Sequence, residues 1–312
     1  MSVRVLDGLA PAPSDLRGAS IALGVMDGVH HGHQAVLAAA RNDAHARGAP
    51  FCAAVFEPHP RHYFQEGGHF RIQSAAQRAR AIAALGADAV FEIKFDKALA
   101  DMPAEVFARD VLAGKLGAKH VSVGFDFQYG HRRGGNAETL RQQGETLGFT
   151  VSAAPAITDQ GERISSTSIR AHISEGGVEN AAALMGRPFA IEGIVSHGQQ
   201  LGRTIGFPTI NVWLKDYVRP RLGVYAVRVS IEGGPPRAGV ANVGLNPTTS
   251  TLPEPRLETF VFDFNADVYD RMSETSFVGF IRPERKFDSL AAMTAQIDND
   301  VIAAKALLAA SS

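Results

Sequence analysis

The sequence has a single cysteine among its 312 residues, so the chain cannot form an internal disulfide bond. This scarcity is typical of a reducing compartment, and it predicts a cytoplasmic protein. Cys52 lies in the apolar stretch FCAAVF, where a small buried hydrophobic residue is expected rather than a nucleophile. No stretch has the length and hydropathy of a signal peptide or a membrane span, so no membrane association is expected.

The chain also lacks an excess of charge of either sign. Its 31 lysines and arginines nearly balance its 32 aspartates and glutamates, and neither end carries a charged tail. A protein that binds nucleic acid irrespective of sequence needs a basic surface. We therefore expect no nucleic-acid partner. Apolar residues make up 45% of the chain, which is enough to bury the core of an ordinary globular protein.

The length of the chain exceeds that of one typical core and favours two domains. In the first half, apolar runs expected to be strands alternate with helical patterns. The expected strands are 21–25, 51–56, 89–95, 121–125 and 150–154, and the expected helices are 34–47, 75–86, 103–116 and 137–147. Ser74 and Gln77 form a capping box that starts the second helix. Such alternation predicts βαβ units and a parallel sheet, whose ligands bind beyond the carboxyl ends of the strands.

The pattern changes near residues 185–188. From there, short apolar stretches follow one another with turn residues between them, which predicts an antiparallel β-barrel or sandwich. The expected strands are 189–195, 223–231, 238–243, 257–264 and 277–282, and a helix over 289–309 closes the chain. We place the domains at 1–186 and 187–312.

The most distinctive stretch of the first half is GVMDGVHHGHQ, residues 24–34. It follows the first expected strand and opens the first helix, whose N-terminus would attract a phosphate group. Gly24, Gly28 and Gly32 would let the backbone approach an anion, and His30 and His33 would donate hydrogen bonds to its oxygens. The His-x-Gly-His pattern resembles the signature of the nucleotidyltransferase superfamily. The alternative is a metal cluster formed by His30, His31, His33, His59 and His62.

Two further stretches suggest anion binding. ISSTSIR places Ser165, Ser166 and Thr167 before a helix, with Arg170 one turn later. These residues form either a simple N-cap or a second phosphate cradle, in which Arg170 acts as a forked donor. In FEPHPR, two prolines stop the second strand and Arg61 can face an anion, although a structural turn explains the same stretch.

The stretch VGFDFQYG ends the fourth expected strand, where a ligand crevice is expected. Asp126 could hydrogen-bond a sugar or base there, while Phe127 and Tyr129 could stack on a ring. The alternative is a strand end with ordinary core aromatics.

The second half carries a glycine-rich loop, GQQLGRTIGFPTIN, which is not a Walker motif. Its glycines and Arg203 could fold over phosphates, or they form an ordinary barrel turn. Thr209 and Asn211 stand two residues apart, so on an extended segment they share a face and could bind Mg²⁺ with ATP phosphates.

Glu258 lies in RLETFVFDF, on a strand face that it shares with Phe260, Phe262 and Phe264. It lies either at a solvated strand end or in a half-buried place that raises its pKa toward that of a general base. We favour the general base.

Taken together, these motifs resemble the bacterial bifunctional riboflavin kinase/FAD synthetase family over nearly the whole chain. The resemblance rests on 24–33, 56–61, 124–130, 165–170, 202–211, 223–226, 239–248, Glu258 and 282–287. It implies a Rossmann-like nucleotidyltransferase sheet, followed by an antiparallel β-barrel with a terminal helix. It also implies two ATP-dependent steps: phosphorylation of riboflavin to FMN, and adenylylation of FMN to FAD with release of pyrophosphate.

The resemblance further implies a role for each motif. In the kinase, Glu258 takes the proton, Asn211 assists and Thr209 holds Mg²⁺. Catalysis of adenylyl transfer falls to His30, His33 and Arg170. The nucleotide-binding residues are Gly24, Asp27, Gly32, Asp126, Ser165, Ser166 and Thr167 in the first domain and Gly202, Arg203 and Gly206 in the second. The flavin-binding residues are His59, Arg61 and Phe127.

Three residues depart from the family pattern. Met26 stands where phenylalanine is usual, Asn246 where arginine precedes Pro-Thr, and Phe260 where histidine follows the glutamate. The last two lie in the kinase half, so the alternative function is an FMN adenylyltransferase whose impaired kinase domain only binds flavin and ATP.

A transferase for another mononucleotide would leave the second domain unexplained. A binding-only sensor would have lost Glu258 or the histidines. The expected partners are riboflavin, FMN and ATP, and the chain is expected to be a monomer or weak homo-oligomer.

Overall fold

The computed structural model describes residues 3–64, 68–159, 161–197, 207–245 and 255–311. The chain forms two compact units, each with its own core. The first comprises Met1–Gly68 and Ser74–Ser166, and the second comprises His69–Gln73 and Thr167–Ser312. The second unit thus includes a short segment of the first half of the sequence. The boundary at 186/187 remains a prediction from the sequence.

The first unit is built on a parallel six-stranded sheet of order β1-β4-β3-β2-β5-β8. Its strands are β1 Arg4–Asp7, β2 Ser20–Gly24, β3 Phe51–Glu57, β4 Ala89–Lys94, β5 His120–Gly124 and β8 Thr150–Ala154. The five expected strands are present, and β1 joins the edge beside β4. From β2 the chain proceeds outward to β3 and β4, and it then returns to place β5 on the other side of β2. The order therefore reverses between β2 and β5, where parallel sheets form a ligand crevice.

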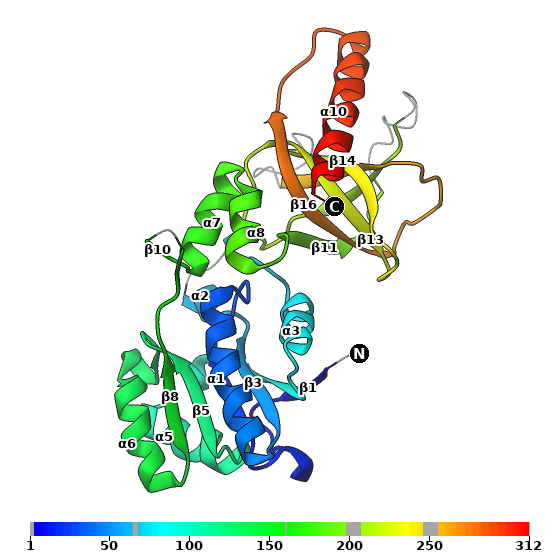
Figure 1. Cartoon of the computed structure of the whole chain (residues 1–312). Helices are drawn as coiled ribbons and strands as arrows, with labels where there is room; N and C mark the ends of the chain where they lie inside the picture. The colour runs from blue at the N-terminus through cyan, green and yellow to red at the C-terminus, as the bar shows by residue number, and fades with distance from the viewer. Residues whose placement is uncertain (1–2, 65–67, 160, 198–206, 246–254, 312) are drawn as a thin grey trace. The chain divides into compact units, whose positions relative to one another are not determined.

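Helices cover both faces of this sheet (Figure 1). The elements are η1 Ser14–Leu16, α1 His31–Arg47, α2 Pro60–Phe64, α3 Ala75–Ala84, α4 Lys97–Ala100, α5 Ala104–Val106, η2 Phe107–Lys115, η3 His131–Arg133 and α6 Ala137–Leu147. Helices α1 and α3 pack on one face, while η2 and α6 pack on the other. The expected helix over 103–116 is α5 followed by the π-helix η2. Two short hairpins complete the unit, β6 Gln128–Tyr129 with β7 Gly135–Asn136 and β9 Thr158–Asp159 with β10 Glu162–Arg163.

The second unit is an antiparallel barrel of order β11-β16-β13-β14-β15-β12. Its strands are β11 Ala190–Ile194, β12 Thr209–Trp213, β13 Gly223–Ile231, β14 Arg237–Leu245, β15 Pro255–Val261 and β16 Met272–Pro283. Its helices are α7 Ser166–Glu175, whose first residue belongs to the first unit, α8 Val178–Met185 and α10 Leu290–Ala310. A bridge between Ser196 and Asn211 brings the two edges together. Strand β15 ends at Val261, three residues earlier than expected, and Asp263 just beyond it adopts a φ of 50°. The ring of Phe262 still contacts that of Phe260, with centroids 5.7 Å apart.

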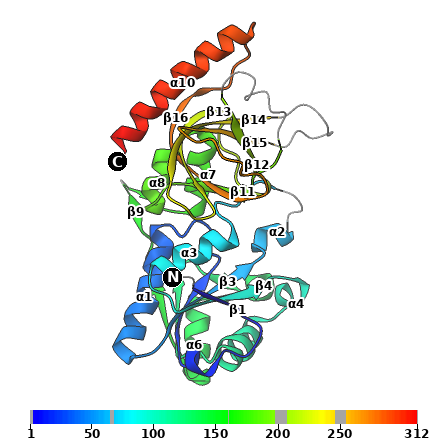
Figure 2. The ribbon, with the colours of Figure 1, turned by 90° about the vertical axis from the view of Figure 1, so that its right-hand side faces the viewer.

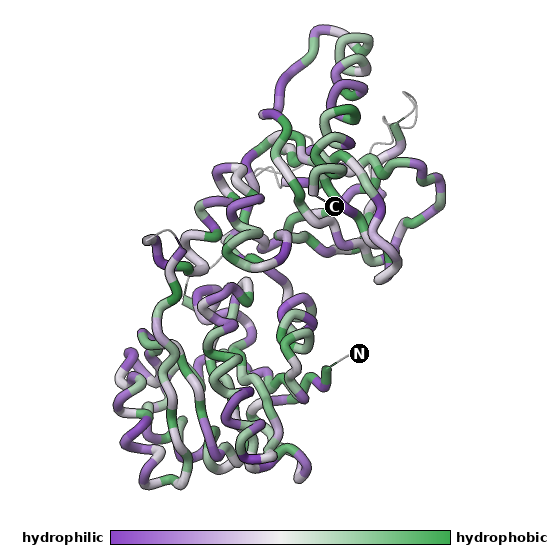
Figure 3. Tube along the Cα trace, viewed as in Figure 1, coloured by the Kyte–Doolittle hydropathy of each residue, from purple (hydrophilic) through white to green (hydrophobic). Residues whose placement is uncertain are grey.

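The terminal helix α10 packs against β13, β14 and β16 (Figure 2). Ala304 and Leu308 of this helix are buried against Val224, Val240 and Phe262 of the barrel. Polar and apolar residues alternate along α10, as the changes of colour in Figure 3 show. In the described part of the chain, none of the helices is long and apolar enough to cross a membrane.

A partly buried polar cluster at the amino ends of β2, β5 and β8 predicts acid sensitivity of the first unit. Asp43 accepts hydrogen bonds from Ser20 and Arg47, and Nδ1 of His120 lies 3.7 Å from its carboxylate. The ring of His120 also contacts the hydroxyls of Thr150 at 2.8 Å and Ser152 at 2.9 Å. Burial lowers the pKa of His120, which the nearby carboxylate of Asp43 only partly offsets.

The folded His120 therefore binds its proton at a lower pH than the unfolded chain does, whose histidines titrate near ~6.5. The free energy of unfolding should fall as the pH drops below about 6.5, by at most ~1.4 kcal/mol per pH unit for this group. Partial burial raises the pKa of Asp43, but the bonds from Ser20 and Arg47 outweigh it, so this carboxylate stays ionised over that range. Urea unfolding between pH 5 and 8 should show a shallower slope for His120→Gln than for the wild type. Equal slopes would remove His120 as the cause.

Candidate active sites

The loop between β2 and α1 lies at the point where the strand order reverses. Three of its residues have positive φ: Met26 at 53°, Gly28 at 93° and Val29 at 38°. A β-branched residue rarely adopts this conformation, which costs about 1–3 kcal/mol and persists only when neighbours hold it. Gln34 Nε2 donates to the carbonyl of Val29 at 3.0 Å, and Ser166 Oγ donates to the carbonyl of Asp27 at 2.9 Å. These two hydrogen bonds come from outside the loop and stabilise its shape.

The two histidines of this loop form a compact pair at the N-terminus of α1. His30 is the N-cap residue, and its Nδ1 accepts a hydrogen bond from the backbone N–H of His33 at 3.4 Å. This bond places the proton of the neutral ring on Nε2. The two rings stack with centroids 3.7 Å apart, and His30 is buried. A Cβ on Gly32 would lie 3.0 Å from Cε1 of His30, so a larger residue there would displace the ring.

This loop brings together His30, Gly32 and His33, and Asp27 earlier in the loop is buried. Gly24 precedes the loop, and a Cβ there would meet only ordinary contacts at 3.6 Å, so packing alone does not require glycine. Across the described residues, no three histidine, cysteine, aspartate or glutamate side chains gather closely enough to hold a metal ion. The five histidines named for the alternative metal cluster therefore do not form such a group in the described structure.

The ISSTSIR stretch spans the boundary between the two units. Ser165 and Ser166 belong to the first, where Ser166 bonds to the loop as described. Thr167 and Arg170 belong to the second unit. Arg170 Nε donates to the carbonyl of Phe70 at 2.6 Å, and its guanidinium carbon lies 5.8 Å from the centre of that ring. The contact of Thr167 and Arg170 with a nucleotide remains a prediction.

His59 and Arg61 follow β3, the strand next to β2, so both motifs leave the same edge of the sheet. The backbone N–H of Arg61 donates to Nδ1 of His59 at 3.0 Å, and Arg61 is exposed at the start of the short helix α2. The guanidinium is thus accessible to an anion at this edge.

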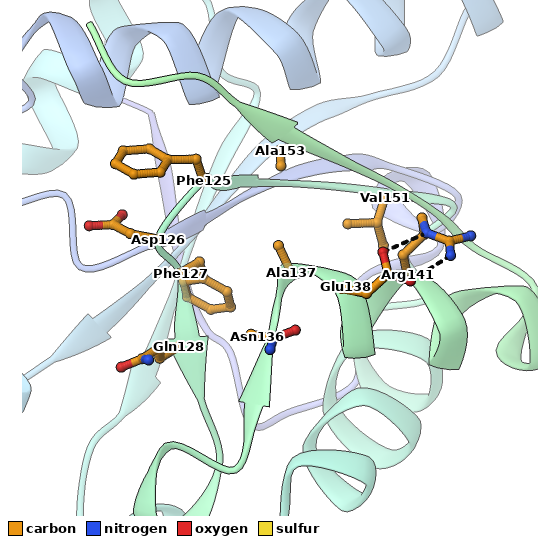
Figure 4. Close-up of a pocket in the computed structure, with 10 residues that line it drawn as sticks. All are labelled: Phe125, Asp126, Phe127, Gln128, Asn136, Ala137, Glu138, Arg141, Val151 and Ala153. Atoms are coloured by element: carbon orange, nitrogen blue, oxygen red, sulfur yellow. Dashed lines mark hydrogen bonds and ion pairs between the residues drawn. The ribbon is translucent and has the colours of Figure 1, made fainter.

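A pocket of about 480 Å³ opens beside the carboxyl ends of β5 and β8 (Figure 4). It is lined by Phe125, Asp126, Phe127, Gln128, Asn136, Ala137, Glu138, Arg141, Val151 and Ala153. Its size lies in the usual range for small-molecule sites, ~300–1,000 Å³. Asp126 and Phe127, both expected to bind ligand, are among these residues. Tyr129 instead belongs to the core, because it is buried and its hydroxyl donates to Gln143 at 2.7 Å.

A second polar site lies on one face of the barrel, at strand positions that pair directly. Asn211 on β12 is opposite Glu258 on β15, and Glu258 is opposite Asn242 on β14. Directly opposite residues of antiparallel strands share a face, so these three side chains form one row. Thr209 lies two residues before Asn211, opposite Phe260. The ring of Phe260 packs edge-on against Phe207 at 5.2 Å.

Asn211 and Glu258 differ in their surroundings. Asn211 is buried, and its Oδ1 has no hydrogen-bond partner among the described residues. The side chain of Glu258 is 42% exposed, and it forms an ion pair with Arg256 at 3.2 Å. The guanidinium of Arg256 is itself buried against Trp213. Glu258 can therefore meet a ligand while Arg256 holds its orientation.

Several residues of these sites were not expected from the sequence. Asn242 interrupts an apolar strand, which could have marked it. A Cβ on Gly244 would lie 2.7 Å from Oε1 of Glu284, so this glycine lets a second carboxylate approach the row. Arg78 is buried in the first unit and contacts the loop after β2. Gly202, Arg203, Gly206 and Asn246 lie outside the described residues.

Comparison with known proteins gives matches over both halves of the chain. The family model for FAD synthetase matches residues 12–168, and the model for riboflavin kinase matches residues 185–308. A bifunctional riboflavin kinase/FMN adenylyltransferase from Pseudomonas fluorescens is 41% identical over 99% of this chain and 98% of its own length. Its counterpart from Escherichia coli strain K12 is 36% identical over 97% and 96%. A crystal structure titled macrolide-efflux protein, from Streptococcus pneumoniae, has a TM-score of 0.84 and 29% identity, and the match covers 98% of this chain and 99% of that one.

Proposed function

The chain belongs to the family of bifunctional riboflavin kinase/FMN adenylyltransferases, and from this premise we propose which residues carry each of its two reactions. The enzyme phosphorylates riboflavin to FMN with ATP, and it adenylylates FMN with a second ATP to give FAD and pyrophosphate. The observation that carries our assignment of residues is the presence, in one chain, of a histidine pair at a helix N-terminus and of a polar barrel row containing Glu258.

Adenylyl transfer is assigned to the first site. An oxygen of the FMN phosphate attacks the α-phosphorus of ATP, the bond to the β-phosphate breaks, and pyrophosphate leaves. This nucleophile is already ionised, so the reaction requires no base, and catalysis consists of positioning and charge stabilisation. His30 and His33 donate to the phosphate oxygens at the N-terminus of α1, where the helix dipole also favours negative charge. The further residues proposed to bind ATP are Gly24, Asp27, Gly32, Ser165, Ser166, Thr167 and Arg170.

FMN is proposed to approach from the neighbouring strand ends. Arg61 and His59 would bind its phosphate at the end of β3. Phe127 lines the pocket beside β5, whose volume suits a flavin ring, so we propose that it contacts the flavin. Asp126 lines the same pocket and is proposed to bind the nucleotide.

Phosphorylation of riboflavin is assigned to the row on the barrel. The ribityl 5′-hydroxyl attacks the γ-phosphorus of ATP, ADP leaves, and Glu258 accepts the proton of the hydroxyl. Its partial exposure leaves the carboxylate accessible to the alcohol, and Arg256 fixes one of its oxygens. Asn211 assists from the facing strand. Gly202, Arg203 and Gly206 are proposed to cover the ATP phosphates.

We propose that the kinase uses Mg²⁺, because the oxygen donors of this row suit that ion. The buried Oδ1 of Asn211 lacks a partner in the described part of the barrel, and the hydroxyl of Thr209 shares its strand face. Mg²⁺ prefers oxygen ligands and completes its shell with water and phosphate oxygens. Thr209, with Asn211 beside it, would hold the ion, which neutralises charge on the ATP phosphates when bound.

We also propose that the enzyme works in the cytoplasm, where ATP is available and where the buried free thiol of Cys52 stays reduced. We further propose that the chain is a monomer or a weak homo-oligomer.

Chromatography of flavins tests the proposal directly. Incubation of the pure protein with riboflavin, ATP and Mg²⁺ is expected to give FMN and FAD, and incubation with FMN and ATP is expected to give FAD. ATP consumption should depend on added flavin. FAD from FMN without any product from riboflavin would indicate an impaired kinase and would direct attention to Asn246 and Phe260. Absence of flavin product in both incubations would overturn the assignment.

A further inference from the structure

Arg78 is a buried cation in the first unit, and neither reaction assigned above uses it. It lies in the first turn of α3, which begins at a capping box: Ser74 Oγ accepts from the N–H of Gln77 at 3.0 Å, and Gln77 Oε1 accepts from the N–H of Ser74 at 2.9 Å. The side chain of Arg78 is 3% exposed and lies in the same row of the helix as the buried Ile82. Burial of an unpaired charge would cost several kcal/mol, so its contacts must compensate for that cost.

Those contacts join the carboxyl ends of three adjacent strands. Nη1 donates to the carbonyl of Val25, directly after β2, and to the carbonyl of Phe56 at the end of β3, both at 3.3 Å. Nη2 donates to the carboxylate of Glu57 at 2.8 Å and lies 3.8 Å from that of Glu92 on β4. The forked guanidinium thus contacts two backbone turns and two carboxylates at once, which an ammonium group cannot do.

The two turns are those that adenylyl transfer requires. Val25 begins the loop that leads to the His30–His33 pair, and Glu57 precedes the turn that carries His59 and Arg61. The first loop contains the unfavourable φ angles of Met26 and Val29, so its shape depends on bonds from outside it. Arg78 supplies such a bond at the start of the loop. The same group fixes the neighbouring turn.

We propose that Arg78 is a positioning residue for adenylyl transfer: it sets the spacing between the ATP loop and the FMN-phosphate turn. This inference rests on the proposed function of the first unit. Transfer rates depend steeply on the distance between the attacking oxygen and phosphorus, and a displacement of ~1 Å costs roughly a hundredfold. Removal of Arg78 should therefore lower kcat more than it weakens the binding of either substrate.

The test compares Arg78→Met and Arg78→Lys with Arg80→Met, which changes an exposed arginine of the same helix. We expect Arg78→Met to lower kcat for FAD formation from FMN roughly tenfold to a hundredfold, with a smaller change in either KM. Arg78→Lys keeps the charge beside Glu57 and should recover part of that loss. Arg80→Met should match the wild type. Riboflavin phosphorylation by the same samples should be unchanged in all three variants.

Thermal unfolding separates positioning from folding. The proposal is overturned if FAD formation falls only in proportion to the fraction of unfolded protein, if both Arg78 variants fail to fold, or if Arg78→Lys has the kcat of the wild type. A wild-type chain that makes no FAD from FMN would instead overturn the proposed function, before any variant is considered.

Discussion

A chain in which His33 is replaced by alanine should convert riboflavin to FMN at the wild-type rate but form FAD roughly 10²–10³-fold more slowly, the usual cost of removing one donor to a developing negative charge. His33 lies in the first turn of α1, stacked on the buried ring of His30. Alanine favours the helical conformation, so α1 should persist. Its backbone N–H can still donate to His30. The expected loss of FAD formation would therefore be caused by removal of the imidazole and not by a change in α1. Flavin chromatography with riboflavin and with FMN as substrates measures both rates.

His45→Ala is the matched control, since it removes an exposed histidine from the last turn of the same helix. It should leave both rates unchanged. Equal loss of FMN and FAD formation in His33→Ala would mean that the two sites are not independent. Unchanged FAD formation would remove His33 from the chemistry and leave the N-terminus of α1 as the phosphate-binding element.

Local patterns were enough to predict most of the fold because each expected element is consistent with its neighbours. The apolar runs of β2, β3 and β5 are buried on both faces, and α3 begins at the expected capping box. Helix α1 ends where Gly48 adopts a φ of 60°, as the glycine and proline after it predict. The family resemblance supplied the closure of the second half into a barrel, which spacing alone left open.

The elements that were missed depend on contacts with distant parts of the chain. Strand β1 is mostly exposed and has no apolar run, so only its pairing with β4 identifies it. Arg78 carries a charge, which usually marks the solvent face of a helix, and its burial requires the ends of β2 and β3. Asn242 becomes part of a site only because the register of β14 and β15 places it opposite Glu258. The register of two strands is set by how they pair, and the apolar pattern of one strand does not specify its partner residues.

Glu258→Gln is expected to impair the reaction that His33→Ala leaves intact, the phosphorylation of riboflavin. A ribityl hydroxyl must lose its proton during attack on the γ-phosphorus, whereas the phosphate of FMN carries no proton that has to leave. General bases typically contribute ~10²–10⁴-fold, so FMN formation from riboflavin should fall by about that factor. FAD formation from added FMN should be unchanged. Glutamine keeps an oxygen that can accept from Arg256, so the buried guanidinium is not left without an acceptor.

Glu232→Gln is the control, because it neutralises an exposed carboxylate of the same unit that pairs with Arg271 outside the polar row. Its rates should equal those of the wild type. If Glu258→Gln phosphorylates riboflavin normally, the proton leaves by another route, and the nearby carboxylate of Glu284 becomes the group to test. If the variant instead loses FAD formation from FMN, the proposal that only riboflavin phosphorylation needs a base is wrong. We expect Glu258→Gln to lose only FMN formation and His33→Ala to lose only FAD formation. Together these results would assign the general base to the reaction whose nucleophile is a neutral alcohol.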